Sequence, residues 1–209
     1  MKNIPEIKKG SRLYVFIDAS NVWNAIKSVR KFINYKKLKD YFEKNLGASK
    51  VSFFYYDAFP KEETREYDVS GKHNFYTYLE KGLGFTVRKK KLKVINTIDE
   101  EGEEVIREKG NMDVEIAIDF VEKINEYDVA FLFSGDVDFL ALVKYLKKHG
   151  KKTYVFSTMG NISNELKTGG SGYFELKDIK HIWGKDLIRR KNKTTLSKED
   201  GSGMYDPHG

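Results

Sequence analysis

Two short apolar runs constrain the fold of this chain more than any other feature. Residues 13–17 (LYVFI) and 129–133 (VAFLF) are continuous runs of branched and aromatic side chains, and the first ends at Asp18 in the turn-like segment DASN. Strands of a parallel sheet are covered on both faces, so they read as unbroken apolar runs. We therefore predict two buried parallel strands here.

Segments with helical character separate further strands along the chain. Helices are predicted at residues 22–32, where Asn21 can act as the N-cap, and at residues 35–46, which Gly47 ends. Further strands are predicted at residues 51–59, 153–157 and 173–176, further helices from Asp113 onwards and at 139–149 and 162–167, and a weakly helical segment at 61–81. Because parallel neighbours need crossover connections, this alternation indicates an α/β fold with a mainly parallel sheet covered on both faces.

Residues 85–98 (FTVRKKKLKVINTI) alternate between apolar and basic side chains. This pattern predicts a strand with one wet, positive face. The polar turn EEGEE before residues 105–107 then predicts a β-hairpin at the margin of the sheet. The basic run RKKKLK is usually a solvated strand face, and contact with nucleic acid is the alternative.

Length and composition indicate one domain with an additional segment at each end. A chain of 209 residues can bury one α/β core, which we assign to residues 11–184, after an N-terminal extension at residues 1–10. Residues 185–209 are polar, basic and poor in large apolar side chains, so we expect a flexible tail. The net charge of +7 and the pI near 9.2 favour anionic partners, nucleic acid first, although such a charge is ordinary for many soluble proteins.

Residue usage argues against several classes of chemistry. The chain has no cysteine, which removes thiolate nucleophiles, zinc thiolate sites and disulfides, and its 4 histidines are widely spaced without an HExxH pattern. No segment approaches the ~20 apolar residues that cross a bilayer, and the N-terminus lacks the apolar stretch of a signal peptide. We expect a soluble, cytoplasmic protein with no membrane partner, whose catalysis would depend on carboxylates.

Four aspartates are placed where they should meet at one rim of the sheet. Asp18 ends the first strand, Asp136 and Asp138 follow residues 129–133, and Asp113 begins a helix with an apolar face. Ligands bind beyond the carboxyl ends of parallel strands, so we expect these carboxylates together. Their mutual repulsion indicates a divalent cation, and oxygen ligands favour Mg²⁺ or Mn²⁺. The predicted metal ligands are Asp18, Asp113 and Asp136.

A site of this kind suits phosphodiester hydrolysis, in which a bound metal lowers the pKa of a water and offsets charge on the phosphoryl oxygens. Asn21 and Ser134 are predicted to orient that water or a ligand, and Asp138 to support the site. Three basic residues are predicted to contact the substrate: Lys109, Arg88 and Lys90. For Lys109, bracing the acids is the alternative role.

Each aspartate also has a purely structural explanation. Asp18 and Asn21 can cap the first helix, Asp138 can be the N-cap of the helix at residues 139–149, and Asp113 can simply begin its own helix. Two further acids of that last helix are expected to be solvated or packing residues: Glu115 and Asp119.

Four segments of the chain together resemble one known family. They are FIDASNV at residues 16–22, KGNMDVEIAIDF at 109–120, SGDVDFLALVKYLKKHGKKTYVF at 134–156 and SNELK at 163–167. In this order they resemble the LabA-like NYN domain of the PIN-like nuclease superfamily. The resemblance covers about residues 11–180, and FIDxxN combined with SGDxDF is far more specific than either piece alone.

The resemblance implies a PIN-like, Rossmann-type sandwich of three α/β/α layers with an acidic metal site and a Mg²⁺- or Mn²⁺-dependent ribonuclease activity. It assigns the site positions of the family to seven residues of this chain: Asp18, Asn21, Lys109, Asp113, Ser134, Asp136 and Asp138. One position departs from the pattern. Many members carry an aspartate after the SxxL segment where this chain has Gly172, a change that favours a one-metal or weakly active site.

Two functions follow from these features. The first is a metal-dependent endoribonuclease that hydrolyses RNA phosphodiester bonds, which the retained aspartates favour. The second is a non-catalytic RNA-binding or regulatory module with the same fold, which Gly172 favours. A phosphatase of the haloacid-dehalogenase type would need an aspartate where this chain has Ser20. We expect no small-molecule cofactor, and a homodimer is left open.

Overall fold

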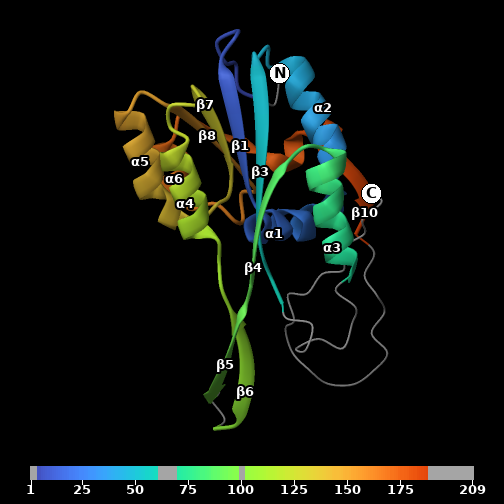
Figure 1. Cartoon of the computed structure of the whole chain (residues 1–209). Coiled ribbons are helices and arrows are strands. Elements are labelled where there is room, and N and C mark those ends of the chain that lie inside the picture. The colour runs from blue at the N-terminus through green and yellow to red at the C-terminus, as the bar shows by residue number, and fades with distance from the viewer. Residues whose placement is uncertain (1–3, 61–69, 99–101, 188–209) are drawn as a thin grey trace.

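A parallel sheet forms the centre of the molecule (Figure 1). The computed structural model describes residues 4–60, 70–98 and 102–187. Six strands of this described part make up the sheet: β1 (Arg12–Asp18), β3 (Lys50–Phe59), β4 (Thr86–Lys91), β7 (Val129–Phe133), β8 (Lys152–Ser157) and β9 (Gly172–Glu175). They lie in the order β4-β3-β1-β7-β8-β9, and each neighbouring pair is parallel. The predicted mainly parallel sheet is confirmed.

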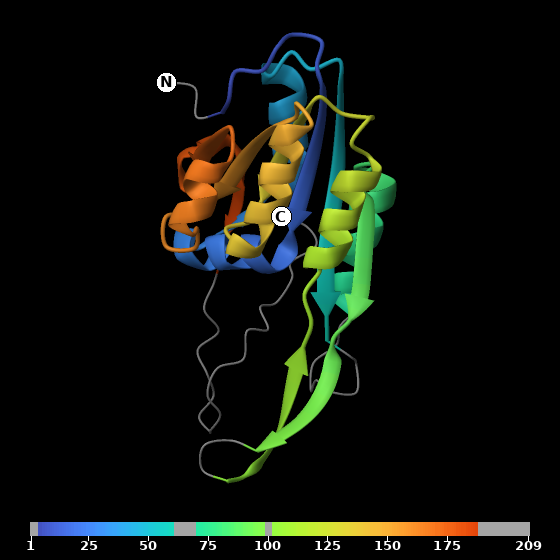
Figure 2. The ribbon, with the colours of Figure 1, turned by 90° about the vertical axis from the view of Figure 1, so that its left-hand side faces the viewer.

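Helices pack on both faces of this sheet and give the molecule three layers (Figures 1 and 2). One face is covered by α1 (Ala19–Val29), α2 (Tyr35–Asn45) and α3 (Ser70–Thr77), and the other by α4 (Asp113–Glu122), α5 (Leu140–Lys148) and α6 (Asn164–Gly169). Successive side chains of β1 point to opposite faces, so Val15 and Ile17 join the first core while Tyr14 and Phe16 join the second. The predicted α/β/α sandwich is confirmed.

The chain enters the sheet near its middle and winds outwards in both directions. From β1 it passes to β3 and then β4, and after α4 it returns to β7 on the other side of β1 before continuing to β8 and β9. The winding therefore reverses between β1 and β7, and ligands of open α/β sheets bind at such a reversal, beyond the carboxyl ends of the strands. Asp18 ends β1 at this point, and Ser134 directly follows β7.

The first helix differs from its prediction at both ends. It begins at Ala19 because Asp18, and not Asn21, is the N-cap: the Asp18 carboxylate accepts a hydrogen bond from the Ser20 backbone N–H at 3.1 Å. It ends at Val29 because Arg30 adopts the left-handed conformation, with φ 59°. Strand β2 (Lys31–Ile33) follows and pairs antiparallel with β10 (Trp183–Asp186), so the prediction of helix up to residue 32 is wrong.

Both ends of the described chain are attached to the sandwich. Ile4 is buried in the first core, and the Gly10 backbone N–H donates to the Gly47 carbonyl at 2.9 Å. At the other end, β10 continues to Asp186, beyond the domain end predicted at residue 184. Residues 188–209 of the predicted tail and residues 61–69 of the weakly helical segment lie outside the described residues. The rest of that segment forms α3 and one π-helical turn, Tyr78–Gly82.

The strand predicted at residues 85–98 is divided at Leu92. Its first half is β4, an edge strand of the central sheet, and the Leu92 backbone N–H donates to the Phe59 carbonyl at 2.8 Å, where β3 ends. Beyond that residue β3 offers no partner, so β5 (Lys93–Ile98) pairs antiparallel with β6 (Glu104–Lys109) instead. The predicted hairpin is thus present, and Figures 1 and 2 show it projecting away from the sandwich beyond the end of β4.

Within the described ranges, no helix has the length and apolar character required to span a membrane.

Two ion pairs connect β4 to α4. The guanidinium of Arg88 donates hydrogen bonds of 2.5 and 2.8 Å to Asp119, and the Tyr56 hydroxyl donates a third of 2.7 Å. Lys90 pairs with Glu115 at 2.7 Å. Asp119 is only 2% exposed. Burial by itself would raise its pKa, but the hydrogen bonds from Arg88 and Tyr56 hold the pKa below its ordinary value. Asp119 is therefore a packing acid that fixes α4 on the sheet.

Breaking the Arg88–Asp119 pair, in which the carboxylate is buried, should destabilise the protein more than breaking the half-exposed Lys90–Glu115 pair. Asp119→Ala is expected to lower the free energy of unfolding by about 2 to 3 kcal/mol, because it leaves the buried Tyr56 hydroxyl without its acceptor and removes the hydrogen bonds from Arg88. Glu115→Ala, the matched control on the same helix, should cost less than about 1 kcal/mol. Urea denaturation followed by circular dichroism measures both losses, and equal losses would contradict the assignment.

Candidate functional site

Three aspartates from two segments come together beside the reversal point of the sheet. Asp113 is the first residue of α4, Asp136 follows β7, and Asp138 lies in the 3₁₀ turn Val137–Phe139 that leads into α5. One carboxylate oxygen of each lies within 4.8 Å of those of the other two. Asp113 and Asp136 are half-buried and Asp138 is exposed. Three negative oxygens at this distance repel one another unless a cation lies between them, and an all-carboxylate set suits Mg²⁺ or Mn²⁺.

The electrostatics of Asp113 record this crowding. Burial, and then the charges of Asp18, Asp136 and Asp138, raise the pKa of Asp113 to about 6, although a hydrogen bond from the Asn111 side chain acts in the opposite direction. The ionised carboxylate is therefore unfavourable at this position without a compensating positive charge. This observation supports a cation among the three carboxylates.

Asp18 lies outside this group of three, and protein donors surround it. It is 2% exposed. Its Oδ1 accepts from the Ser20 backbone N–H at 3.1 Å and from the Ser20 hydroxyl at 2.7 Å, whereas its Oδ2 accepts from the Asn21 amide at 2.7 Å and from the Ser134 hydroxyl at 3.1 Å. Asp18 therefore caps α1, and its charge also acts on Asp113. Its role as a direct metal ligand stays a prediction.

The segment after β7 is held by a short relay of hydrogen bonds. The Ser134 hydroxyl, which donates to Asp18, accepts from the Asp136 backbone N–H at 3.2 Å, and Asp136 Oδ1 accepts from the Asp138 backbone N–H at 3.0 Å. Asp136 is thus the N-cap of the turn, so the alternative that Asp138 caps the next helix is wrong. The Asp138 side chain instead joins the carboxylate group.

Asn21 connects α1 to two other segments of the rim. Its amide donates to Asp18, and its Oδ1 accepts from the Gly135 backbone N–H at 3.0 Å and from the Asn161 amide at 3.1 Å. Asn21 therefore orients Asp18. Asn161 is not among the site residues that the sequence predicts. The available signal was its place in the loop after residues 153–157, since that loop leaves the sheet at the same rim as Asp18.

The three predicted substrate-contacting cations have different surroundings. Arg88 and Lys90 are already paired with Asp119 and Glu115 of α4, so their charges are matched within the protein. Lys109 is exposed at the end of β6, four residues before Asp113. Contact of any of the three with substrate stays a prediction, and Lys109 retains an uncommitted charge for it.

Gly172 is remote from the carboxyl ends of the strands. It begins β9 and pairs with Tyr154, whereas Glu175 ends β9 opposite Ser157 at the carboxyl rim. The Glu175 carboxylate accepts from the Met159 backbone N–H at 2.9 Å and from the Tyr173 hydroxyl at 2.7 Å. Because Gly172 lies at the amino end of its strand, the absence of an acid at this position leaves the group of three aspartates intact.

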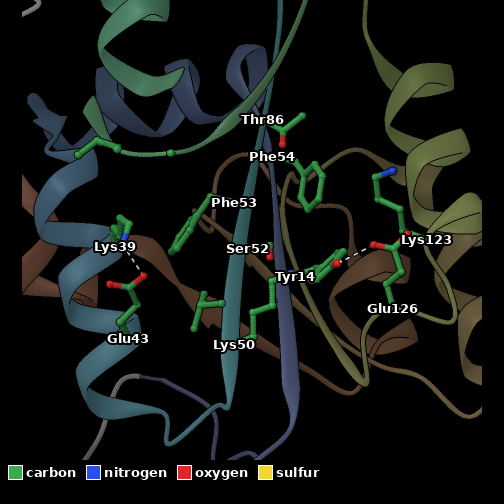
Figure 3. A pocket seen from close by; sticks show the side chains of 13 residues that line it. Tyr14, Lys39, Glu43, Lys50, Ser52, Phe53, Phe54, Thr86, Lys123 and Glu126 are labelled. Atoms are coloured by element: carbon green, nitrogen blue, oxygen red, sulfur yellow. Dashed lines mark hydrogen bonds and ion pairs between the residues drawn. The ribbon is translucent and has the colours of Figure 1, made fainter. Parts of the chain in front are cut away.

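A separate hollow lies at the other end of the sheet (Figure 3). Its lining includes Tyr14 of β1 and Ser52 and Phe53 near the beginning of β3, at the amino ends of these strands. Its two acids already have partners: Glu43 pairs with Lys39, and Glu126 accepts from the Tyr14 hydroxyl. This hollow is therefore distinct from the aspartate site.

Gly135 has no room for a side chain, which provides a test of the rim. A Cβ at this position would lie 2.0 Å from the Asn161 carbonyl oxygen and 2.7 Å from Ser157 Oγ. Gly135→Ala must displace the backbone that carries Asn161, so we expect a loss of about 2 to 3 kcal/mol in the free energy of unfolding. Gly160→Ala, in the same loop but with open space around the new Cβ, should change it by less than about 0.5 kcal/mol. Urea denaturation compares the two variants, and a tolerated Gly135→Ala would refute this packing.

The raised pKa of Asp113 makes stability without metal depend on pH. The pKa is about 6 in the folded protein and 3.8 when unperturbed, so folding favours the protonated form. Stability should therefore fall as pH rises from about 4 to about 6 and then level off. Asp113→Asn removes this loss, so its Tm in EDTA should exceed that of the unchanged protein by a margin that grows over this range.

Asp40→Asn provides the control for that measurement. A hydrogen bond from Lys36 lowers the pKa of Asp40. This variant should therefore show no such gain, and a pH-independent margin for Asp113→Asn would contradict the prediction.

Comparisons with known proteins agree with this architecture. The family model of the NYN domain matches residues 12–176. The "Low amplitude and bright protein LabA" of Synechococcus elongatus is 31% identical over 170 residues, which are 81% of this chain and 86% of that protein. The crystal structure of a protein of unknown function from Vibrio parahaemolyticus shares the fold, with a TM-score of 0.63 at 22% identity over 86% of this chain and 99% of that one. This chain belongs to the NYN domain family.

Proposed function

We propose that this protein is a metal-dependent endoribonuclease whose site is the group Asp113, Asp136 and Asp138, with Asp18 beside it. The observation that carries the proposal is the convergence of three carboxylate oxygens within 4.8 Å at the reversal point of the sheet, together with the raised pKa of Asp113. Membership of the NYN domain family, which supports a nuclease or RNA-related role, points in the same direction.

The side chains at the site would divide the chemistry among them. Asp113 and Asp136 would hold Mg²⁺ or Mn²⁺ with Asp138. A bound ion of this kind lowers the pKa of a water and offsets charge on the phosphoryl oxygens. Asp138 is the most exposed of the three, and its carboxylate takes no part in capping, so it is the best placed to accept the proton of the attacking water.

Asp18 and its donors would serve as the rigid support of the site. Its hydrogen bonds with Ser20, Asn21 and Ser134 fix the end of β1 against the segment that carries Asp136. A support of this kind keeps the catalytic carboxylates within the narrow range of positions that hydrolysis requires. In this proposal the RNA binds at the surface of the protein, against the carboxyl ends of the strands. The protein is proposed to act in the cytoplasm.

A second candidate is a non-catalytic RNA-binding or regulatory module. The observation in its favour is that both oxygens of Asp18 are already satisfied by protein donors, so a fourth carboxylate for a metal is not available without rearrangement. This module would keep the fold, the aspartates and RNA affinity but would not cut.

Incubation of the purified chain with end-labelled RNA and DNA separates the two candidates. With Mg²⁺ or Mn²⁺ we expect cleavage of RNA, with EDTA none, and for Asp136→Asn a rate lower by at least about a hundredfold. Asp40 of α2 is half-exposed, and Asp40→Asn is the matched control that should cut at the original rate. RNA that is bound but left whole under all conditions, or cut equally by Asp136→Asn, would reject the nuclease in favour of the binding module.

A further inference from the structure

The β5–β6 ribbon begins and ends next to the aspartate site. Its first strand continues from the carboxyl end of β4, and its second strand leads through residues 110–112 directly into Asp113. Figures 1 and 2 show the ribbon extending outwards from this rim, past the end of the sandwich. The ribbon is therefore an extension of the site and not a remote decoration of the fold.

The register of the ribbon separates its charges by face. Residues directly opposite in an antiparallel pair share a face, and so do residues two apart in one strand. One face therefore carries Lys93 opposite Lys109 and Ile95 opposite Arg107, with no acid among its paired residues. The other face carries Glu104 opposite Ile98 and Glu108 opposite Val94. We call the first face the basic face.

The basic face contains an unfavourable pair that calls for an anion. Lys93 and Lys109 are opposite each other, and like charges in directly opposite positions destabilise a strand pair. Arg107 adds a third cation two residues along the same strand. Among the described residues, no carboxylate lies within ion-pair distance of these three side chains, in contrast to Arg88 and Lys90 on the preceding strand. An anionic ligand would relieve this repulsion.

The ribbon also lacks a covering layer of its own. A two-stranded ribbon is marginally stable in water without further packing. Val94 and Ile95 are 36% and 37% exposed, and Ile98 is 71% exposed. These exposed apolar side chains fit a segment that a partner covers on contact. Because the charged residues of the basic face are all positive and no acid lies among them, the partner that fits this face is a polyanion.

We propose that the basic face, Lys93, Arg107 and Lys109, binds the sugar–phosphate backbone of the RNA beside the bond that is cut, and so places the strand on the aspartate site. This inference rests on the proposed function for its substrate. Lys109 is four residues from Asp113, at most about 14 Å along the chain, so a strand held here lies beside the carboxylates. Arg88 and Lys90, which α4 engages, take no part.

The test measures binding without cleavage. Full-length Asp136→Asn protein in EDTA is titrated into fluorescent single-stranded RNA, and anisotropy is recorded at several salt concentrations. Replacing Lys93, Arg107 and Lys109 by Gln should weaken affinity at low salt at least about tenfold and reduce the slope of log K against log salt by about 2, since each contact to a single strand contributes about 0.7. Exchanging Lys93 and Lys109 for Arg should preserve the affinity.

The control removes the same charge elsewhere. Lys44, Lys147 and Lys148 are exposed in the last turns of α2 and α5, at the amino ends of the strands, and their replacement by Gln should leave the salt slope almost unchanged. The Tm of the variant with Gln at positions 93, 107 and 109 should not fall, because the variant removes a repulsive pair. An unchanged Tm would show that the lost affinity does not come from unfolding.

Two results would overturn the proposal. One is equal weakening by the ribbon and control variants, which would mean that overall charge alone attracts RNA. The other is unchanged RNA affinity with an altered molecular mass in size-exclusion light scattering, which would make the ribbon a contact between copies of this chain. The measurement does not depend on catalysis: RNA binding through the ribbon without any cleavage would reject only the nuclease.

Discussion

The carboxylate of Asp18 is the interaction on which the arrangement of the rim depends. It is buried at the end of β1 and accepts hydrogen bonds from Ser20, Asn21 and Ser134, which belong to two segments more than a hundred residues apart in the chain. A buried carboxylate is tolerable only when its oxygens are satisfied, so the donors must stay in place for the protein to remain folded. The same requirement that stabilises the fold therefore fixes the geometry beside the group of three aspartates.

Asp18 and its partners extend this order to the loops. Asn21 is hydrogen-bonded to Gly135 and Asn161, and the Ser134 hydroxyl is hydrogen-bonded to the backbone of Asp136. The acids of the candidate site are thus positioned by polar contacts at the strand ends, while the two apolar cores only fix where those ends lie. One set of hydrogen bonds thus both caps α1 and fixes the segment after β7, while the role of Asp18 as a metal ligand stays a prediction.

Local patterns were sufficient to predict the sandwich and the convergence of three of the four acids, although Asp18 lies outside their group. The apolar run of β7 and the SGDVD segment after it predict a buried strand and the turn that follows it from about a dozen residues. The rule that ligands bind beyond the carboxyl ends of parallel strands then places the acids at one rim. Features that depend on distant partners were not accessible in this way. The strand predicted at residues 85–98 divides at Leu92 only because β3 stops at Phe59, and the charge of Arg88 is matched only because α4 places Asp119 against it. The contact of Asn161 with Asn21 joins a loop to the first turn of α1, 140 residues earlier, which no short window reveals.

The ribbon is joined to the sandwich at two places, Leu92 and residues 110–112. At this junction Leu92 packs against Gly110, and a Cβ on Gly110 would come within 3.0 Å of the Leu92 side chain. On the sandwich side, the ion pairs of Arg88 and Lys90 hold β4 against α4. Only residues 110–112 separate β6 from Asp113. The position of the ribbon and the position of the Asp113 carboxylate are therefore linked through three residues of chain.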